Sequence, residues 1–176
     1  MRIVAGKYRG KKLKEFDLDS TRPTTDRVKE SIFNLIQFDV VDAVVLDLFS
    51  GTGALGIEAI SRGAKKTYMI DQNIKAINII KDNLKEIQGD FVVKHIDAIE
   101  FLKQSEKFDI VLIDPPYKTD LGVKAIDIII NQNKLNENGI IIFETSAELY
   151  FDFDYEGFDI TKRKYGTVMV YKFVKQ

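Results

Sequence analysis

The chain has 176 residues, of which 45% are hydrophobic and 30% charged, and its formal net charge is −1 at pH 7. These values favour one globular domain and exclude a disordered or fibrous chain. With no cysteine and with His95 as the one histidine, the sequence excludes a disulfide framework, a thiolate nucleophile, a Cys/His zinc cluster and a Ser-His-Asp triad, and we expect no bound metal. No apolar run approaches the ~20 residues of a membrane-spanning helix, so we expect a cytoplasmic protein with no membrane contact.

The first 14 residues are strongly basic, with six Lys or Arg side chains and no acid. The stretch RIVAGKYRGKKLKEF is predicted to form two short strands about a turn at Gly6 and Gly10. A basic hairpin of this kind suits a polyanion, because phosphate contacts give a long-range attraction that depends on salt. Candidate RNA contacts are Arg9, Lys11 and Lys12. A solvated surface hairpin is the alternative.

The segment DRVKESIFNLI, residues 26–36, is predicted to be a helix that leads into the main sheet. Its apolar positions recur at helical spacing and should pack inward: Val28, Ile32, Leu35 and Ile36. The charged positions between them should face solvent: Arg27, Lys29 and Glu30. Arg22 and Arg27 are candidates for binding RNA phosphate or for bracing the site, although a solvated helix face explains Arg27 nearly as well.

From about residue 41, strand-like and helix-like segments alternate. The predicted strands are VVLDLF, KKTYMID, FVVKHI, DIVLID and GIIIFE, and the predicted helices begin at Leu55, at Asn73 and near residue 121. This alternation predicts an α/β fold, a doubly wound and mostly parallel sheet covered by helices on both faces. The tail FDITKRKYGTVMVYKF predicts an antiparallel hairpin that completes a seven-stranded sheet. We divide the chain into an extension over residues 1–40 and a main domain over residues 41–176.

Doubly wound sheets bind ligands beyond the carboxyl ends of their strands, and polar residues follow several predicted strands here. Residues 46–56, LDLFSGTGALG, place Gly51, Gly53 and Gly56 at the spacing of a dinucleotide-binding loop, where glycines allow a tight turn and close approach to a cofactor. This spacing alone does not name the cofactor. Asp71 lies near the offset at which an acid binds ribose hydroxyls. Asp97 is predicted to cap a helix, to bind a ligand, or both.

The sequence DIVLIDPPY, residues 109–117, favours a methyl donor over a hydride carrier. Each proline fixes its own φ, restrains the residue before it and removes an N–H donor, so the segment becomes a stiff row of hydrogen-bond acceptors. Asp114 and a proline carbonyl could both accept from an exocyclic amine, and Tyr117 offers a face on which a flipped base stacks. A hydride-transfer enzyme has no evident use for this arrangement. A simple turn is the alternative.

The chain resembles class I S-adenosylmethionine-dependent methyltransferases with a D/N-P-P-Y/F motif, and more narrowly the bacterial 16S ribosomal RNA methyltransferases that modify the exocyclic amine of guanine. The resemblance rests on RIVAGKYRGKKL, TRPTTDRVKESIFN, LDLFSGTGALGIEAISRGA and DPPY, which occur in this order over essentially the whole chain. It implies a methyltransferase domain over residues 41–176. It also implies that 16S ribosomal RNA, free or within a partly assembled small subunit, is the partner, and that S-adenosylhomocysteine is the product.

The resemblance also assigns roles to residues of this chain. The methionine part of the cofactor would be surrounded by Asp47, Phe49, Ser50, Gly51, Thr52, Gly53, Ala54 and Leu55. The adenosine part would be bound by Asp71, Gln72, Asn73, Asp97 and Ala98. The catalytic motif would comprise Asp114, Pro115, Pro116 and Tyr117. At position 71 the family often has glutamate, so the shorter aspartate changes the expected geometry at the ribose.

Three questions stay open at this point. His95 lies in a predicted strand, and a structural role is favoured over a catalytic one. The basic cluster of Lys162, Arg163 and Lys164 in the terminal hairpin is either an RNA contact, with Lys164 as the candidate, or a polar turn. The competing functions are another amino-methyltransferase acting on DNA or RNA adenine, which the lack of an evident target-recognition domain disfavours, and a non-catalytic RNA-binding or ribosome-assembly protein.

Overall fold

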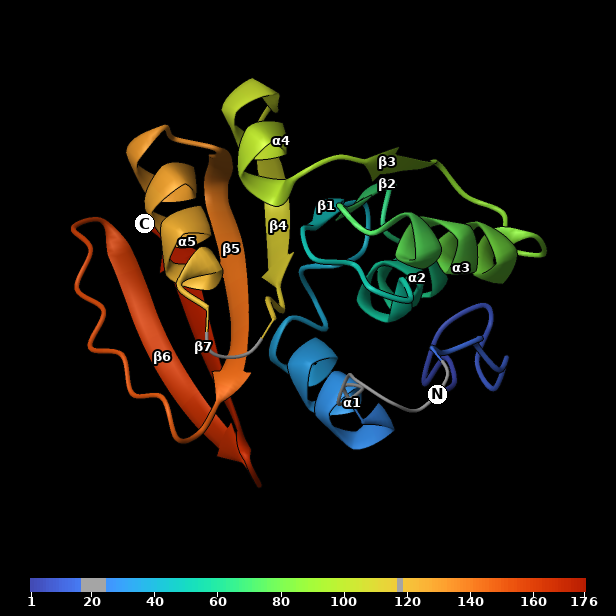
Figure 1. The fold of residues 1–176 in the computed structure, drawn as a ribbon. Helices are drawn as coiled ribbons and strands as arrows, with labels where there is room; N and C mark the ends of the chain where they lie inside the picture. Colours follow the sequence, from blue (N-terminus) through green and yellow to red (C-terminus); the bar gives the residue numbers. More distant parts are fainter. Residues whose placement is uncertain (17–24, 117–118) are drawn as a thin grey trace.

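The computed structural model describes residues 1–16, 25–116 and 119–176, and these form one seven-stranded sheet with helices on both faces (Figure 1). The strands are β1 (Val44–Asp47), β2 (Lys66–Asp71), β3 (Phe91–His95), β4 (Phe108–Ile113), β5 (Leu135–Ser146), β6 (Phe158–Tyr165) and β7 (Val168–Lys175). Their order across the sheet is β3-β2-β1-β4-β5-β7-β6. The first five strands are parallel, and β7 is antiparallel to both of its neighbours. This arrangement confirms the predicted doubly wound sheet and its terminal hairpin.

Helices cover the sheet in two groups. The helices are α1 (Asp26–Leu35), α2 (Ala54–Ser61), α3 (Ile74–Leu84), α4 (Ala98–Gln104) and α5 (Leu121–Asn131). Apolar side chains of α4 and α5 form one core cluster with the sheet, and those of α1 and α2 form a second cluster with it. A third cluster joins α2 and α3 to β2 and to the N-terminal segment. Central strands therefore have both faces buried, which explains their continuous apolar sequences.

Three helices begin at side-chain caps. The Thr25 hydroxyl accepts from the Val28 N–H at α1, and the Asn73 carbonyl oxygen accepts from the Lys75 N–H at α3. At α4, one carboxylate oxygen of Asp97 accepts from two backbone N–H groups, as the sequence predicted for a cap. These caps fix the residue at which each of the three helices starts.

The prediction that Lys29 faces solvent is wrong. Its side chain is fully buried, its Nζ lies 3.4 Å from a carboxylate oxygen of Glu58 in α2, and it donates a 2.5 Å hydrogen bond to the Arg2 carbonyl. Burial lowers the pKa of Lys29, and the adjacent Glu58 carboxylate opposes that shift. The face of α1 that carries Lys29 is covered by the N-terminal segment, which a helical periodicity does not reveal.

The N-terminal arm, residues 1–16, pairs with itself as an antiparallel hairpin, as expected, but over fewer residues than two full strands would. Its antiparallel pairing is reduced to one isolated bridge between Arg2 and Lys12. Around this bridge, the Ile3 N–H bonds to the Lys11 carbonyl and the Gly10 N–H to the Ile3 carbonyl. Nearer the turn the donors are used elsewhere: the N–H groups of Val4 and Ala5 bond to the Glu58 carboxylate, and that of Lys7 bonds to the Ser61 carbonyl. Contacts with α2 therefore shorten the ladder of the hairpin. The division of the chain at residue 40 stays a prediction.

Within the described residues, none of the helices combines the length and the apolar character needed to cross a bilayer.

Candidate functional site

Four aspartates follow four neighbouring strands at one edge of the sheet. Asp47 ends β1 and Asp71 ends β2, while Asp97 and Asp114 follow β3 and β4. Because these strands are parallel, their carboxyl ends meet at the same edge. The chain proceeds outward from β1 to β3 and then returns to the other side of β1 with β4. This reversal of strand order is the place where doubly wound sheets bind ligands.

The glycine loop, residues 50–53, connects β1 to α2 and is fixed by Ser50. The Ser50 hydroxyl donates to the Asp47 carbonyl and accepts from the Ile70 N–H, each at 2.8 Å, so the loop is tied to both β1 and β2. Gly51 and Gly53 have φ of 54° and 79°, a region in which side-chain-bearing residues are strained. The loop thus presents backbone rather than side chains beside the first turn of α2.

Asp47 is a buried carboxylate beneath this loop. Its Oδ2 accepts a 2.8 Å hydrogen bond from the Gly56 N–H, and a Cβ on Gly56 would lie 3.1 Å from the same oxygen and 2.6 Å from a Met69 side-chain carbon. Glycine at position 56 is therefore required by packing. Burial is the largest cause of a pKa raised to about 7; the Gly56 hydrogen bond opposes it, and the carboxylates of Asp114 and Asp71 add to it. The edge carries a local excess of negative charge.

Asp71 is held by backbone donors. One oxygen accepts from the Gly51 N–H at 2.8 Å and the other from the Asn73 N–H at 2.7 Å, so the carboxylate joins the glycine loop to the start of α3. Gln72 and Asn73 are exposed beside it. His95 lies at the end of β3 with its Nε2 2.9 Å from the Gln72 carbonyl. Each oxygen of the carboxylate can accept a further hydrogen bond, and the ribose role of Asp71 stays a prediction.

The catalytic motif predicted at residues 114–117 follows β4 directly. Asp114 is half-buried, Pro115 is buried and Pro116 is exposed, with its carbonyl accepting a 2.8 Å hydrogen bond from the Thr119 hydroxyl. The first turn of α5 packs on this motif, because a Cβ on Gly122 would lie 2.9 Å from a ring carbon of Pro115. Tyr117 lies outside the described residues. The described part of the motif is braced by α5 from one side.

Sequence reasoning missed Glu144, which lies on β5 next to the motif. Its side chain is buried, and the pairing of Ile113 with Phe143 makes Asp114 and Glu144 neighbours on adjacent strands. The signal was present in IIIFE, where a charged residue ends an apolar strand at the same edge as the four aspartates. Two further buried polar residues were missed on helices, Glu58 in α2 and Asn83 in α3. Each lies on the apolar face of its helix.

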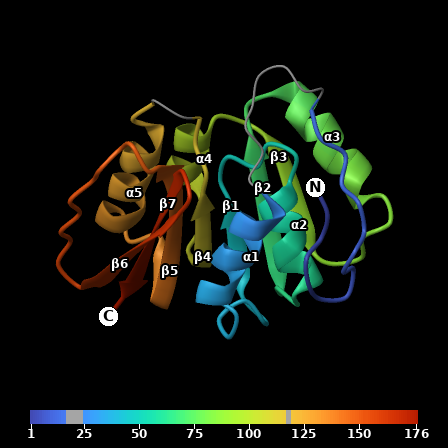
Figure 2. The ribbon, with the colours of Figure 1, turned by 90° about the horizontal axis from the view of Figure 1, so that it is seen from below.

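The basic candidates are not gathered at one place. Arg9 and Lys12 are exposed on the N-terminal arm, but Lys11 is ion-paired with Glu86. The arm lies beside α2 and α3, whereas Lys164, which is exposed, lies on β6 at the other end of the sheet (Figure 2). Arg27 is exposed on α1, and Arg22 lies outside the described residues. Among the described residues, we find no group of three or more acidic or histidine side chains placed to hold a metal ion.

Comparison with known proteins gives consistent results. Residues 1–174 match the family described as conserved hypothetical protein 95. Ribosomal RNA small subunit methyltransferase D of Haemophilus influenzae is 36% identical over 154 residues, covering 84% of this chain and 80% of the relative. Its Escherichia coli counterpart is 36% identical over 150 residues, covering 84% and 76%. The solved Escherichia coli structure named for the methyltransferase yhhF superposes with a TM-score of 0.90 at 30% identity, over 100% of this chain and 98% of that one.

Proposed function

The chain belongs to the conserved hypothetical protein 95 family, with the ribosomal RNA small subunit methyltransferases D among its relatives, and from this premise we propose that it methylates 16S ribosomal RNA. The donor is S-adenosylmethionine and the acceptor is the exocyclic amine of a guanine. The observation that carries the proposal is the position of residues 114–116 immediately after β4, beside the glycine loop and Asp47 at the strand-order reversal.

The residues at this edge fit the proposed cofactor. S-adenosylmethionine is a cation at its sulfonium, and this edge carries the carboxylates of Asp47, Asp71 and Asp114. The pKa of Asp47 is raised mainly by burial, and the negative charges of Asp114 and Asp71 add to that shift. The glycine loop leads into the N-terminus of α2, where Gly53 is the cap residue and no side chain caps the helix. We assign the methionine part to Asp47 and to residues 49–55, and the adenosine part to Asp71, Gln72, Asn73, Asp97 and Ala98. Asp97 caps α4 through one of its two carboxylate oxygens.

Catalysis in this proposal depends on position more than on acid–base equipment. When bound, the cofactor would supply a methyl group on a good leaving group: the N–C bond would form as the C–S bond breaks, and the proton lost by the amine would pass to Asp114 or to water. The amine itself is a poor nucleophile because its lone pair is delocalised into the base. Asp114 and the Pro115 carbonyl would accept hydrogen bonds from the amine and favour a pyramidal nitrogen in the transition state. Aligned reactants can recover ~7–11 kcal/mol of the barrier.

The experiment that tests this function is methyl transfer from radiolabelled S-adenosylmethionine to three acceptors: 16S ribosomal RNA, the same RNA in partly assembled small subunits, and double-stranded DNA. We expect label in 16S RNA and, after digestion, in a 2-methylguanosine fragment. Label in adenine would replace guanine as the target while leaving the methyltransferase intact. RNA binding without transfer to any acceptor would reject catalysis and favour an assembly role.

A further inference from the structure

The side chain of Asn83 links the N-terminal arm, which carries candidate RNA contacts, to the glycine loop, which we assign to the cofactor. Asn83 is a buried residue of α3, and its side-chain Nδ2 donates to the Thr52 carbonyl in the glycine loop at 3.0 Å and to the Lys14 carbonyl in the N-terminal arm at 3.1 Å. Its Oδ1 accepts from the Lys14 N–H at 2.7 Å. One amide thus uses both donors and an acceptor to join the arm to the loop that we assign to the cofactor.

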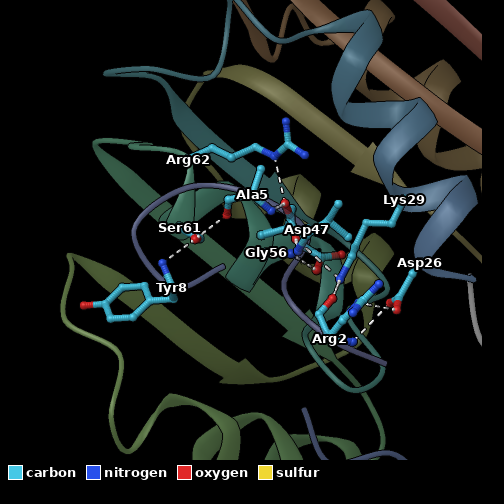
Figure 3. A network of polar contacts seen from close by, with 11 residues as sticks. Arg2, Ala5, Tyr8, Asp26, Lys29, Asp47, Gly56, Ser61 and Arg62 are labelled. Carbon is cyan, nitrogen blue, oxygen red and sulfur yellow. Dashed lines mark hydrogen bonds and ion pairs between the residues drawn. The ribbon is translucent and has the colours of Figure 1, made fainter. Parts of the chain in front are cut away.

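The arm is anchored independently at its other end. In the polar network of Figure 3, Ser61 bonds to Ala5 and Tyr8, and Lys29 approaches the Arg2 carbonyl. At the centre of this network lies the buried Glu58 carboxylate, whose partners are the Val4 and Ala5 N–H groups, Lys29 and Arg62. A Cβ on Gly6 would lie 1.8 Å from the Ser61 carbonyl oxygen, so the arm turns directly against the end of α2.

Both anchors of the arm contact elements that also hold the proposed donor site: α2 at one end and Asn83 of α3 at the other. The helix that carries Glu58 also carries Gly56, whose N–H bonds to Asp47, while Asn83 holds the loop from the side of α3. The exposed cations Arg9 and Lys12 lie on the stretch of arm between the anchors. A polyanion bound to these cations would restrain Lys14 and, through Asn83, the Thr52 carbonyl.

We propose that Asn83 is a positioning residue that couples contact of RNA with the N-terminal arm to binding of the methyl donor in the glycine loop. The inference rests on the proposed function, because it takes residues 50–53 as part of the donor site. Coupling of this kind is reciprocal: if RNA tightens donor binding by some factor, the donor tightens RNA binding by the same factor. Substrate and donor would then each favour the loop conformation that the other needs.

The test measures the affinity of S-adenosylhomocysteine, which binds the donor site without turnover, with and without saturating 16S RNA transcript. In the unmutated protein we expect RNA to lower the dissociation constant by about fivefold or more, the low end of typical coupling. Asn83→Ala should reduce this factor below about twofold, since the side chain that links Lys14 to Thr52 is removed. Asn78→Ala, an exposed change on the same helix, should keep the full factor.

The outcomes separate this inference from the function on which it rests. Coupling of wild-type size in Asn83→Ala, or no coupling in the unmutated protein, overturns the inference even if methyl transfer is intact. Failure of the unmutated protein to bind S-adenosylhomocysteine under any condition overturns the proposed cofactor site itself. If Asn83→Ala does not fold, hydrogen exchange in the unmutated protein decides: RNA alone should slow exchange of the Gly51 and Gly53 amides, and unchanged exchange rejects the coupling.

Discussion

At the scale of single residues, we expect Asp47 to make the proposed donor site sensitive to pH. Its pKa is raised to about 7, so near neutral pH a fraction of the protein carries a proton there. A cationic donor favours the ionised carboxylate, and binding should therefore release that proton. We predict that S-adenosylmethionine affinity falls by roughly tenfold between about pH 7.5 and about pH 6. Calorimetric titration in buffers of different ionisation enthalpy measures both the affinity and the proton release.

The control for this prediction is Asp47→Asn, which should bind S-adenosylmethionine more weakly with a flatter pH dependence, whereas Asp159→Asn on β6 should match the unmutated protein.

The ionisation of Asp47 also makes the free energy of unfolding depend on pH. An ordinary aspartate ionises near pH 3.8 and Asp47 near pH 7, so between these values the folded state holds a proton that the unfolded chain lacks. Its contribution therefore decreases stability as pH rises across that window, with no further change above it.

Asp114 carries the catalytic part of the proposal. Asp114→Ala should leave cofactor affinity within a few-fold and lower single-turnover methyl transfer by ~10²-fold or more, because one preorganised acceptor is removed from the reacting amine. Asp114→Asn keeps an acceptor without negative charge and should give an intermediate rate. Asp120→Ala, an exposed acid just before α5, is the matched control. Transfer at the wild-type rate in Asp114→Ala would reduce the motif to a turn.

The strand-end residues show what a sequence can reveal at this scale. Asp47, Asp71 and Asp114 could be predicted as neighbours because parallel strands bring their carboxyl ends together. The partners of Asn83 could not be predicted in this way. They lie on segments far apart in the chain, at Lys14 and Thr52, and a local pattern contains neither.

At the scale of elements, the joint between α1, α2 and the N-terminal arm depends on a buried ion pair. Lys29→Ala would leave the buried Glu58 carboxylate without one of its two cations, and removal of one partner from a buried pair typically costs ~3–5 kcal/mol. Because Arg62 still pairs with Glu58 at 2.8 Å, we expect the low end of that range. Urea unfolding measures the change, with the exposed Lys75→Ala as control. A loss below about 1 kcal/mol, the value of a surface pair, would contradict the burial argument.

Helical spacing explains both the success and the failure of prediction for these elements. For α3, the apolar repeat predicted the buried positions correctly, since Ile77, Ile80 and Leu84 are all buried. In α1 the same reasoning placed Lys29 in solvent, because it assumed that one face of the helix packs and the other is free. The arm covers that second face, and Glu58 from a different helix supplies the compensating charge. Helical periodicity describes a single helix and does not indicate which other segments pack against it.

At the scale of the whole molecule, the basic N-terminal arm and the basic cluster of Lys162, Arg163 and Lys164 on β6 lie at opposite ends of a seven-stranded sheet, with the proposed catalytic motif after β4 between them. Adjacent strands are ~4.8 Å apart, so the ends of the sheet are separated by roughly 30 Å. A short hairpin RNA could contact either region together with the motif, whereas contact with both requires an extended or folded RNA. If both regions bind RNA as proposed, the arrangement favours a large structured substrate over a short oligonucleotide.

The role of the arm in RNA binding can be tested by comparing its exposed cations with Lys11, which is ion-paired. Replacing Arg9 and Lys12 together by Gln should weaken binding to 16S RNA and reduce the log–log salt slope by ~0.7–0.9 for each phosphate that is no longer neutralised. Lys11→Gln should have a smaller effect on the slope, because Lys11 is paired with Glu86 and its release would cost that interaction. Filter binding across a salt series measures all three proteins. Equal effects of Lys11 and of the exposed pair would mean that RNA displaces Glu86. An unchanged slope in the Arg9 and Lys12 variant would make the arm a brace for α2 and α3 that does not touch RNA.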